Sequence, residues 1–253
     1  MAKELLLEIG TEEIPAAFLP KALKDIERIV KKDFSENRIR HGAVKTMGTP
    51  RRLVLCVREI AEKQDDQVIE KVGPAKKASF DDEGNPTKAA MGFARGQGLE
   101  ISELETITTD KGEYLCARKT IIGEETKALL ANTLPRLITS IPFRKSMRWM
   151  NLELRFARPI HWILALFGGE VVSFKLENIT SGTRSLGHRF MSPEFFEVKD
   201  FEDYLEKTRE HFIIADPEER KRIIIEEARK AAHDVSGEVL ENEDLLDEVT
   251  FLV

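Results

Sequence analysis

The sequence predicts an α+β fold, with mixed sheets and packed helices followed by a more helical, acidic segment. Apolar runs of strand length recur along the chain, and stretches with apolar residues at helical spacing stand between them. Hydrophobic residues make up 42% of the 253 residues and charged residues 33%, which is typical of a globular chain. We expect one α+β domain over residues 1–194, and over residues 195–253 the start or part of a further unit cut by truncation.

The N-terminal part predicts a buried strand, a helix and then several strands. Residues 3–9 are apolar enough for a short buried strand. Pro20 suits the first turn of the following helix, where its missing N–H costs nothing. Residues 42–72 return to short strands rich in Val, Leu and Ile. The helix itself is indicated by apolar residues every three or four positions, namely Leu19, Leu23, Ile26, Ile29 or Val30, and Phe34.

The middle of the chain predicts a loop, a hairpin and a second helix. Residues 73–98 are rich in small and turn-forming residues, which indicates a long loop leading into a short helix near 87–95. The segment GFARGQG is interpreted as a flexible turn behind that helix. A β-hairpin is expected around residues 110–112, and a helix over residues 123–138 that stops near Pro142.

The C-terminal part predicts a strand pair and a capped helix. An apolar run after Pro159 ends in a Gly-Gly turn, and residues 171–176 alternate as a strand. A helix over residues 216–232 is expected to begin with Asp216 as N-cap, with Glu219 completing a capping box. The final DEVTFLV is a strand-like run.

Charge is distributed unevenly along the chain. The net charge of −6 by itself argues against a nucleic-acid partner, because phosphate binding needs local positive charge. Residues 38–58, however, contain six Lys or Arg and no acid, and residues 136–162 contain six against one acid. Residues 194–253 hold 19 acidic residues against eight basic ones. The negative charge of this C-terminal segment therefore masks the two basic segments in the net charge of the chain.

Three basic turns are candidates for binding an anion. Arg51 and Arg52 stand at the mouth of an apolar strand, and residues 145–162 interleave basic residues with Trp149, Phe156 and Trp162. Such a mixture can pair phosphates and stack on bases. The alternative is that the aromatic residues belong to the core and the arginines to an ordinary solvated rim. The third turn, SGTRSLGHRF, is acid-free and has glycines that allow close backbone approach.

The residues indicate no catalytic centre. Nucleophile and zinc-protease signatures are missing, and the adjacent His233 and Asp234 have no further histidines at useful spacing. The acidic pair at positions 12 and 13 is assigned to a solvated turn. Cys56 and Cys116 lie in apolar runs and are expected to be buried thiols. With no signal peptide and no apolar stretch of the roughly 20 residues that cross a bilayer, we expect a cytoplasmic protein without a membrane partner.

Several motifs in order resemble the bacterial glycyl-tRNA synthetase beta chain from residue 5 to about 190. They are LLLEIGTEEIP, TPRRL, GPAKKASFDDEGNPTKAAMGFARGQG, KSMRW, RPIHWILAL and SGTRSLGHRF. The resemblance implies a chain that helps bind and position tRNA(Gly) and assembles with a catalytic alpha chain, with a second beta chain possible. It also implies that ATP and magnesium are used by the alpha chain, and that this fragment contains neither cofactor nor catalytic site. The implied fold is that of the editing domain of the phenylalanyl-tRNA synthetase beta chain.

The basic turns and the resemblance together predict the residues that contact tRNA, because arginine pairs phosphate oxygens bidentately. They are Arg51, Arg52, Arg144, Lys145, Arg148, Trp149, Arg158, His161, Arg184, His188 and Arg189. The alternative for each is an internal carboxylate partner. Two further functions remain open at this point: a non-catalytic scaffold that docks the alpha chain, to which GTEEIP could contribute, and an editing-type hydrolase of mischarged tRNA.

Overall fold

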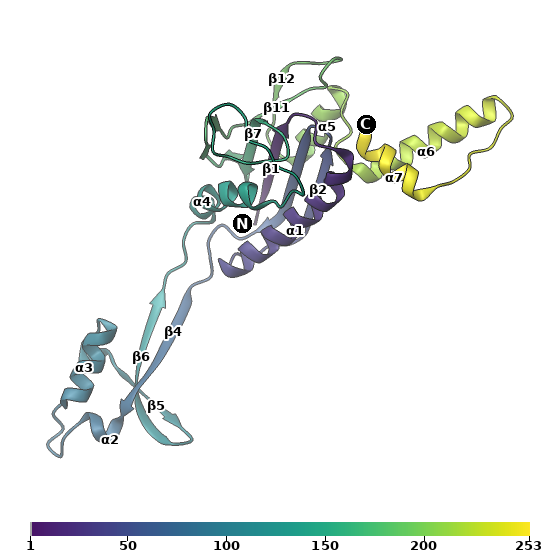
Figure 1. The fold of residues 1–253 in the computed structure, drawn as a ribbon. Coiled ribbons are helices and arrows are strands. Elements are labelled where there is room, and N and C mark those ends of the chain that lie inside the picture. Colours follow the sequence, from purple (N-terminus) through teal and green to yellow (C-terminus); the bar gives the residue numbers. More distant parts are fainter. Residues whose placement is uncertain (1) are drawn as a thin grey trace. The chain divides into compact units, whose positions relative to one another are not determined.

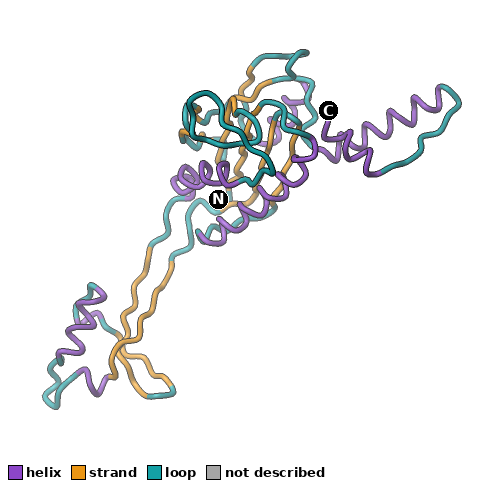
Figure 2. The backbone as a smooth tube through the Cα atoms, viewed as in Figure 1, coloured by secondary structure: helices purple, strands orange, loops and turns teal. Residues whose placement is uncertain are grey.

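The computed structural model describes residues 2–253, which form two compact units (Figure 1). The main unit comprises the chain up to Gln64 and Glu124–Val253, and the inserted unit comprises Asp65–Gly123. Helices and antiparallel sheets occur together, which confirms the α+β class (Figure 2). Residues on both sides of position 194 fall in the main unit, and the division at that position stays a prediction.

The main unit is built on one five-stranded antiparallel sheet in the order β2-β3-β1-β7-β8. The N-terminal strand is therefore the central one, and it is buried over most of its length. The strand expected at residues 3–9 is confirmed. The bounds are β1 Lys3–Thr11, β2 Val44–Thr49, β3 Arg52–Ile60, β7 Ile160–Phe167 and β8 Glu170–Val171.

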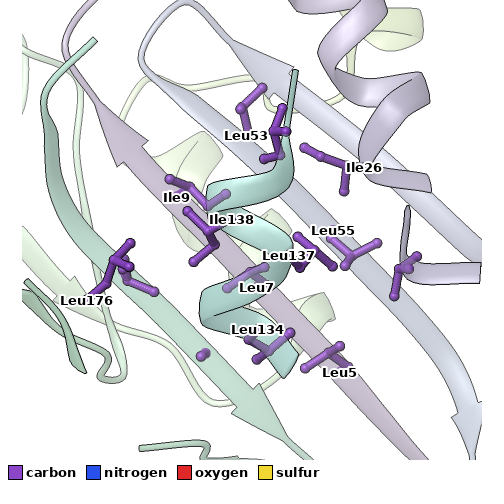
Figure 3. Packing of buried hydrophobic residues seen from close by; sticks show 14 of the residues in the cluster. Leu5, Leu7, Ile9, Ile26, Leu53, Leu55, Leu134, Leu137, Ile138 and Leu176 are labelled. Carbon is purple, nitrogen blue, oxygen red and sulfur yellow. The ribbon is translucent and has the colours of Figure 1, made fainter. Parts of the chain in front are cut away.

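Two helices, α1 (Leu19–Glu36) and α4 (Thr126–Ser140), cover one face of this sheet. Alternate residues of β1, such as Leu7, point to this face because successive side chains of a strand point to opposite sides. Figure 3 shows Leu134, Leu137 and Ile138 of α4 lying over Leu7 and Ile9. Both helices were predicted; α1 has Pro20 in its first turn and follows a short 3₁₀ helix, Ala16–Phe18.

The opposite face of the sheet packs against α5 (Phe201–Glu210) and the segments around it. Leu6 of β1 belongs to this second cluster, together with Phe201 and Tyr204 from α5. Of the strand expected over residues 171–176, only its two ends are regular. The remaining strands of the main unit form two small antiparallel pairs, β9 Lys175–Leu176 with β10 Ile179–Thr180, and β11 Arg184–Leu186 with β12 Phe195–Glu197.

Gly10 allows an indole ring to lie flat against the central strand. In the sheet register Gly10 stands between Arg52 of β3 and Trp162 of β7, so all three share one face. A Cβ atom on Gly10 would lie 1.9 Å from Cε2 of Trp162. The close approach therefore requires glycine at this position, and it holds the tryptophan over the strand.

Two helices, α6 (Pro217–Asp234) and α7 (Glu243–Leu252), end the described chain. Asp216 caps α6 by accepting a hydrogen bond from the backbone N–H of Glu218 at 3.0 Å, as predicted. The expected capping box was wrong, because the carboxylate of Glu219 pairs with Arg209 at 2.7 Å instead. The strand-like end of the sequence was also wrong. It forms α7, whose contacts with α6 and whose Phe251 on the main core outweigh the β preference of Val, Thr and Phe.

The inserted unit is a three-stranded antiparallel sheet in the order β4-β6-β5 with short helices beside it. The predicted hairpin is β5 and β6. The segment GFARGQG was wrongly interpreted as a turn, because the helix runs to Gln97 and Gly98 ends it with φ +68°. The bounds are β4 Gln67–Ala75, α2 Lys76–Ser79, α3 Lys88–Gln97, a 3₁₀ helix Ile101–Glu103, β5 Glu105–Thr109 and β6 Gly112–Ile121.

Both cysteines are buried and free, as expected. Cys56 lies on β3 of the main unit and Cys116 on β6 of the inserted unit. Burial raises the pKa of the Cys56 thiol to about 12, and the charge of Glu4 adds to the effect. The Cys56 thiol is consequently not ionised at neutral pH, and it packs as a small apolar side chain.

Gly10→Ala should destabilise the main unit strongly, by about 3 kcal/mol, because the new methyl group must displace the buried Trp162 ring. Urea unfolding followed by tryptophan fluorescence measures this change. Gly182→Ala is the matched control, since a Cβ there meets nothing within 4 Å. Equal stabilities of the two variants would contradict the close packing described for Gly10.

The Asp216→Asn variant keeps the N-cap of α6 but removes its negative charge, because asparagine caps a helix as well as aspartate does. Burial opposes ionisation of Asp216, but hydrogen bonds from Lys45 and the N–H of Glu218 outweigh it and leave the pKa below 3.8. A lowered folded-state pKa stabilises the fold above about pH 4, and the effect disappears as the pH falls through the folded-state pKa. At pH 6 the melting temperature of the wild type should therefore be about 1–2 °C higher than that of the variant. That difference should shrink below pH 4; one that is constant with pH would contradict the charge effect.

Candidate nucleic-acid interface

The acidic turn after β1 is hydrogen-bonded to two of the predicted basic segments. The N–H of Thr11 donates to Arg51 O at 2.8 Å, and the N–H of Glu12 donates to Pro159 O at 2.9 Å. These bonds bring the start of β3 and the start of β7 to the same end of β1. The GTEEIP motif is thus the point at which separate segments of the chain meet.

Three of the predicted tRNA-contacting residues converge on this turn. His161 Nε2 lies 3.0 Å from Glu12 Oε1, and Arg51 Nη2 lies 4.0 Å from the same oxygen. Arg189 Nη1 donates to Glu13 Oε1 at 2.7 Å. Sequence reasoning assigned Glu12 and Glu13 to a solvated turn; they are partly exposed, but they also pair with these three side chains. Each pair at such exposure contributes little stability, while it reduces the net charge offered to a phosphate.

Arg52 points into the protein rather than to solvent. Its side chain is 3% exposed, and Nη2 donates to Leu186 O at 2.9 Å. The guanidinium carbon lies 5.8 Å from the centre of the Trp162 ring, within reach of a cation–π contact. Arg51 and Arg52, adjacent in the sequence, therefore have different surroundings, and the surface at Arg52 is not open to a large partner.

Glu8 is the centre of a buried polar network next to Arg52. It is fully buried, and its carboxyl oxygens accept hydrogen bonds from Trp162 Nε1, Ser185 Oγ and Tyr204 OH. Burial raises the pKa of Tyr204 well above 10 and Glu8 raises it further, while Arg52 acts in the opposite direction. The Tyr204 hydroxyl therefore stays protonated and donates to Glu8. Trp162, predicted to be a possible stacking residue, is a core side chain.

The segment of residues 143–150, named here the cationic loop, presents charge to solvent. Arg144, Lys145 and Arg148 are exposed, and among residues 2–253 none of them has a carboxylate within 4 Å. The loop is anchored by its aromatic residues: Phe143 packs edge-on against Phe156 with ring centres 4.8 Å apart. Trp149 is half-buried against the main core. The alternative interpretation of the aromatic residues as core is therefore supported here, whereas the cations are free.

The other predicted contacts lie in separate places. Arg158 is half-buried and donates from Nη1 to Ala157 O at 2.9 Å. Arg184 is exposed and lies over the Phe195 ring at 5.3 Å. His188 accepts at Nδ1 from the N–H groups of Phe190 and Met191. The structure consequently brings Arg51, His161 and Arg189 together, and no contact between them and the cationic loop is seen among the described residues.

Sequence reasoning missed two structurally important charged residues, Glu8 and Arg220. Glu8 carried a signal, since it interrupts an apolar strand that is buried on both faces. Arg220 carried none, because it stands in a charged helical segment like its neighbours. No group of three or more His, Cys, Asp or Glu suited to a metal ion occurs in residues 2–253. In the same range, no helix has the length and hydropathy of a membrane span.

Comparison with known proteins places the chain in a family. The family described as Glycyl-tRNA synthetase beta subunit matches residues 5–253. The chain belongs to the glycyl-tRNA synthetase beta subunit family. A glycine–tRNA ligase beta subunit of Syntrophus aciditrophicus (strain SB) is 65% identical over all 253 residues. Those of Geobacter sp. (strain M21) and Citrifermentans bemidjiense are each 55% identical over the same length. The chain spans 37% of the length of these relatives.

Family membership extends the resemblance noted from the sequence motifs. The match runs through the acidic segment to Val253, where the motifs alone ended at about residue 190. Residues 195–253, including α6 and α7, are therefore part of the family's sequence pattern. The buried charged residues Glu8, Arg52 and Arg220 all lie inside the matched range.

Glu8→Ala should lower the free energy of unfolding of this family member by at least about 3 kcal/mol, because three buried donors lose their acceptor. Glu8→Gln, which keeps one acceptor oxygen, should fall between this variant and the wild type. Chemical denaturation measures all three. Glu36→Ala, at the exposed end of α1, is the control and should change stability by no more than about 0.5 kcal/mol. A Glu8→Ala protein as stable as the control would refute the role of the network.

Proposed function

We propose that this chain is the part of a glycine–tRNA ligase beta subunit that helps bind and position tRNA, with the cationic loop making phosphate contacts. The single observation that supports this most is the loop's unpaired charge within a chain of this family. Arg144, Lys145 and Arg148 follow one another closely and carry no competing acid among the described residues. A phosphate group arriving there would not have to displace an existing ion pair.

The remaining basic residues support the proposal unequally. Arg184 is exposed and without an ion pair in the described chain, so it is a second candidate for a phosphate contact. Arg158 is half-buried but also lacks an acidic partner there. Arg51, His161 and Arg189 are paired with Glu12 or Glu13, and they would contact tRNA only by exchanging those partners. For Arg52, which is buried, we propose no contact on the open surface that tRNA would cover.

The proposal extends to the assembly in which the chain would work. The relatives' name, beta subunit, supports a complex with an alpha subunit, and we propose that this chain assembles with such a catalytic chain for attachment of glycine to tRNA(Gly). ATP and magnesium would then be used by the alpha chain. We also propose that the complex contains a second beta chain and that the protein is located in the cytoplasm. The proposed fold type is that of an editing domain.

Replacing Arg144 and Arg148 by glutamine in the full alpha–beta complex should weaken tRNA binding about tenfold at low salt. The slope of log affinity against log salt should fall by about one for each phosphate that the variant no longer neutralises. The measurement is a filter-binding titration at several salt concentrations.

The matched control is the double variant Lys31→Gln and Lys32→Gln on α1, which removes two charges that already pair with Glu27 and Glu36. It should leave both the affinity and the salt slope close to those of the wild type. Equal losses of affinity in the two double variants would show that only net charge matters. An unchanged affinity after substitution of the cationic loop would refute the proposed contact.

A further inference from the structure

A hollow of about 610 Å³ opens beside the buried arginine of β3, within the main unit. Its walls come from six places in the chain: the turn at Thr49–Arg52, residues 187–190, residues 212–214, α6, Glu13, and Leu252 with Val253. The first of these segments is far from the others in the sequence, so the hollow exists only in the folded chain. Its volume lies within the range of roughly 300–1,000 Å³ seen for small-molecule sites.

Four arginines line this hollow against a single acid, Glu13. Arg51, Arg52 and Arg189 come from the predicted basic turns, and Arg220 comes from α6. Arg220 is 5% exposed and is held by carbonyl oxygens, with Nη2 donating to Gly48 O at 2.8 Å and Nε to Thr250 O at 3.1 Å. Burial lowers the pKa of Arg220 to about 10, so it remains charged at neutral pH without a bound carboxylate.

Donors on two of these arginines are buried and unused. Nε and Nη1 of Arg52 and Nε of Arg51 have no hydrogen-bond partner although they are shielded from solvent. Buried donors are nearly always paired in native proteins, and an unpaired one on a charged group is costly. Arg52 is more than nine-tenths buried, lines the hollow, and also acts on the buried Tyr204 hydroxyl.

The same hollow has an aromatic side. Phe190 and Phe212 line it, and their side chains are 78% and 55% exposed. Phe212 has φ +62°, a left-handed conformation at the end of α5 that glycine adopts more easily. A large apolar side chain kept in solvent and on a strained backbone contributes nothing to folding that is visible in the structure. The Arg189 guanidinium lies over the Phe190 ring at 5.2 Å, which leaves the Phe212 ring and the other face of Phe190 to stack on a planar group.

We propose that this hollow binds a nucleotide, with its phosphate on Arg51 and Arg52 and its base against Phe190 and Phe212. A simple anion would satisfy the arginines but leave the exposed Phe212 ring without a partner, whereas a nucleotide carries both a phosphate and a planar base. The nucleotide is either a free mononucleotide or an unpaired nucleotide of an RNA. The inference does not depend on the cationic loop, so it and the proposed tRNA contact there can fail separately.

The first test is calorimetric titration of the full-length chain, without an alpha subunit, with AMP, adenosine and inorganic phosphate. AMP should bind at least tenfold more tightly than either of the other two. Arg51→Gln should reduce AMP affinity to that of adenosine and leave adenosine unchanged. Phe212→Gly, which suits the positive φ, should weaken both AMP and adenosine but not phosphate.

Matched controls are Arg95→Gln, an exposed arginine of α3, and Phe195→Ala, an aromatic residue outside the hollow. Neither should alter AMP binding, and thermal melting checks that every variant is folded. Arg52→Lys keeps the charge but removes the unpaired Nε and Nη1 donors, and it should weaken AMP about tenfold in a protein that still melts cooperatively.

A competition arm separates the two sources of the nucleotide. A single-stranded tetranucleotide RNA that displaces labelled AMP from the wild type, but not after Arg51→Gln, identifies an RNA nucleotide. AMP binding with no displacement by that RNA identifies a free nucleotide. The inference is overturned if AMP does not bind at millimolar concentration, or if its binding is unchanged by Arg51→Gln, Arg52→Lys and Phe212→Gly.

Discussion

The main unit depends on the burial of its first strand on both faces. One face of β1 carries Leu5, Leu7 and Ile9, which pack under α1 and α4. The other face carries Glu8, and a carboxyl group buried there is tolerable because Trp162, Ser185 and Tyr204 all donate to it. These donors come from β7, β11 and α5, so satisfying one buried group fixes the positions of three later elements. Gly10 makes the arrangement possible by leaving room for the indole ring.

That constraint also explains why adjacent arginines have different surroundings. Arg52 shares a face of the sheet with Gly10 and Trp162, and its guanidinium donates a hydrogen bond to Leu186 O. Arg51 precedes the strand and reaches the acidic turn instead. Charge in this chain is therefore divided among arginines inside the protein, cations paired at the Glu12–Glu13 turn, and free cations on the loop at Arg144–Arg148. The last group, like the exposed Arg184, is offered to a partner without a competing carboxylate among the described residues.

Much of the fold was predictable because it depends on local patterns. The strand at residues 3–9, the helices α1, α4 and α6 and the β5–β6 hairpin follow from apolar period, caps and turn residues. The failures have tertiary causes. The segment at residues 243–252 is helical because α7 packs against α6 and the main core. The predicted capping box of α6 does not form because Glu219 pairs with Arg209 instead. In the candidate site, the basic turns were visible, but their acidic and carbonyl partners were not.

The sequence by itself determined the class of fold, the clustering of basic residues despite a negative total, and the family motifs. These are properties of neighbouring residues, and they are readable without knowing which segments meet. Only the tertiary structure decided which arginines are free, because an ion pair or a buried carbonyl contact joins residues that can be more than a hundred positions apart. Arg189 with Glu13, and Arg220 with Gly48, are such pairs. The hollow at Arg52 depends on the same long-range contacts, since six separate parts of the chain must fold together before it exists.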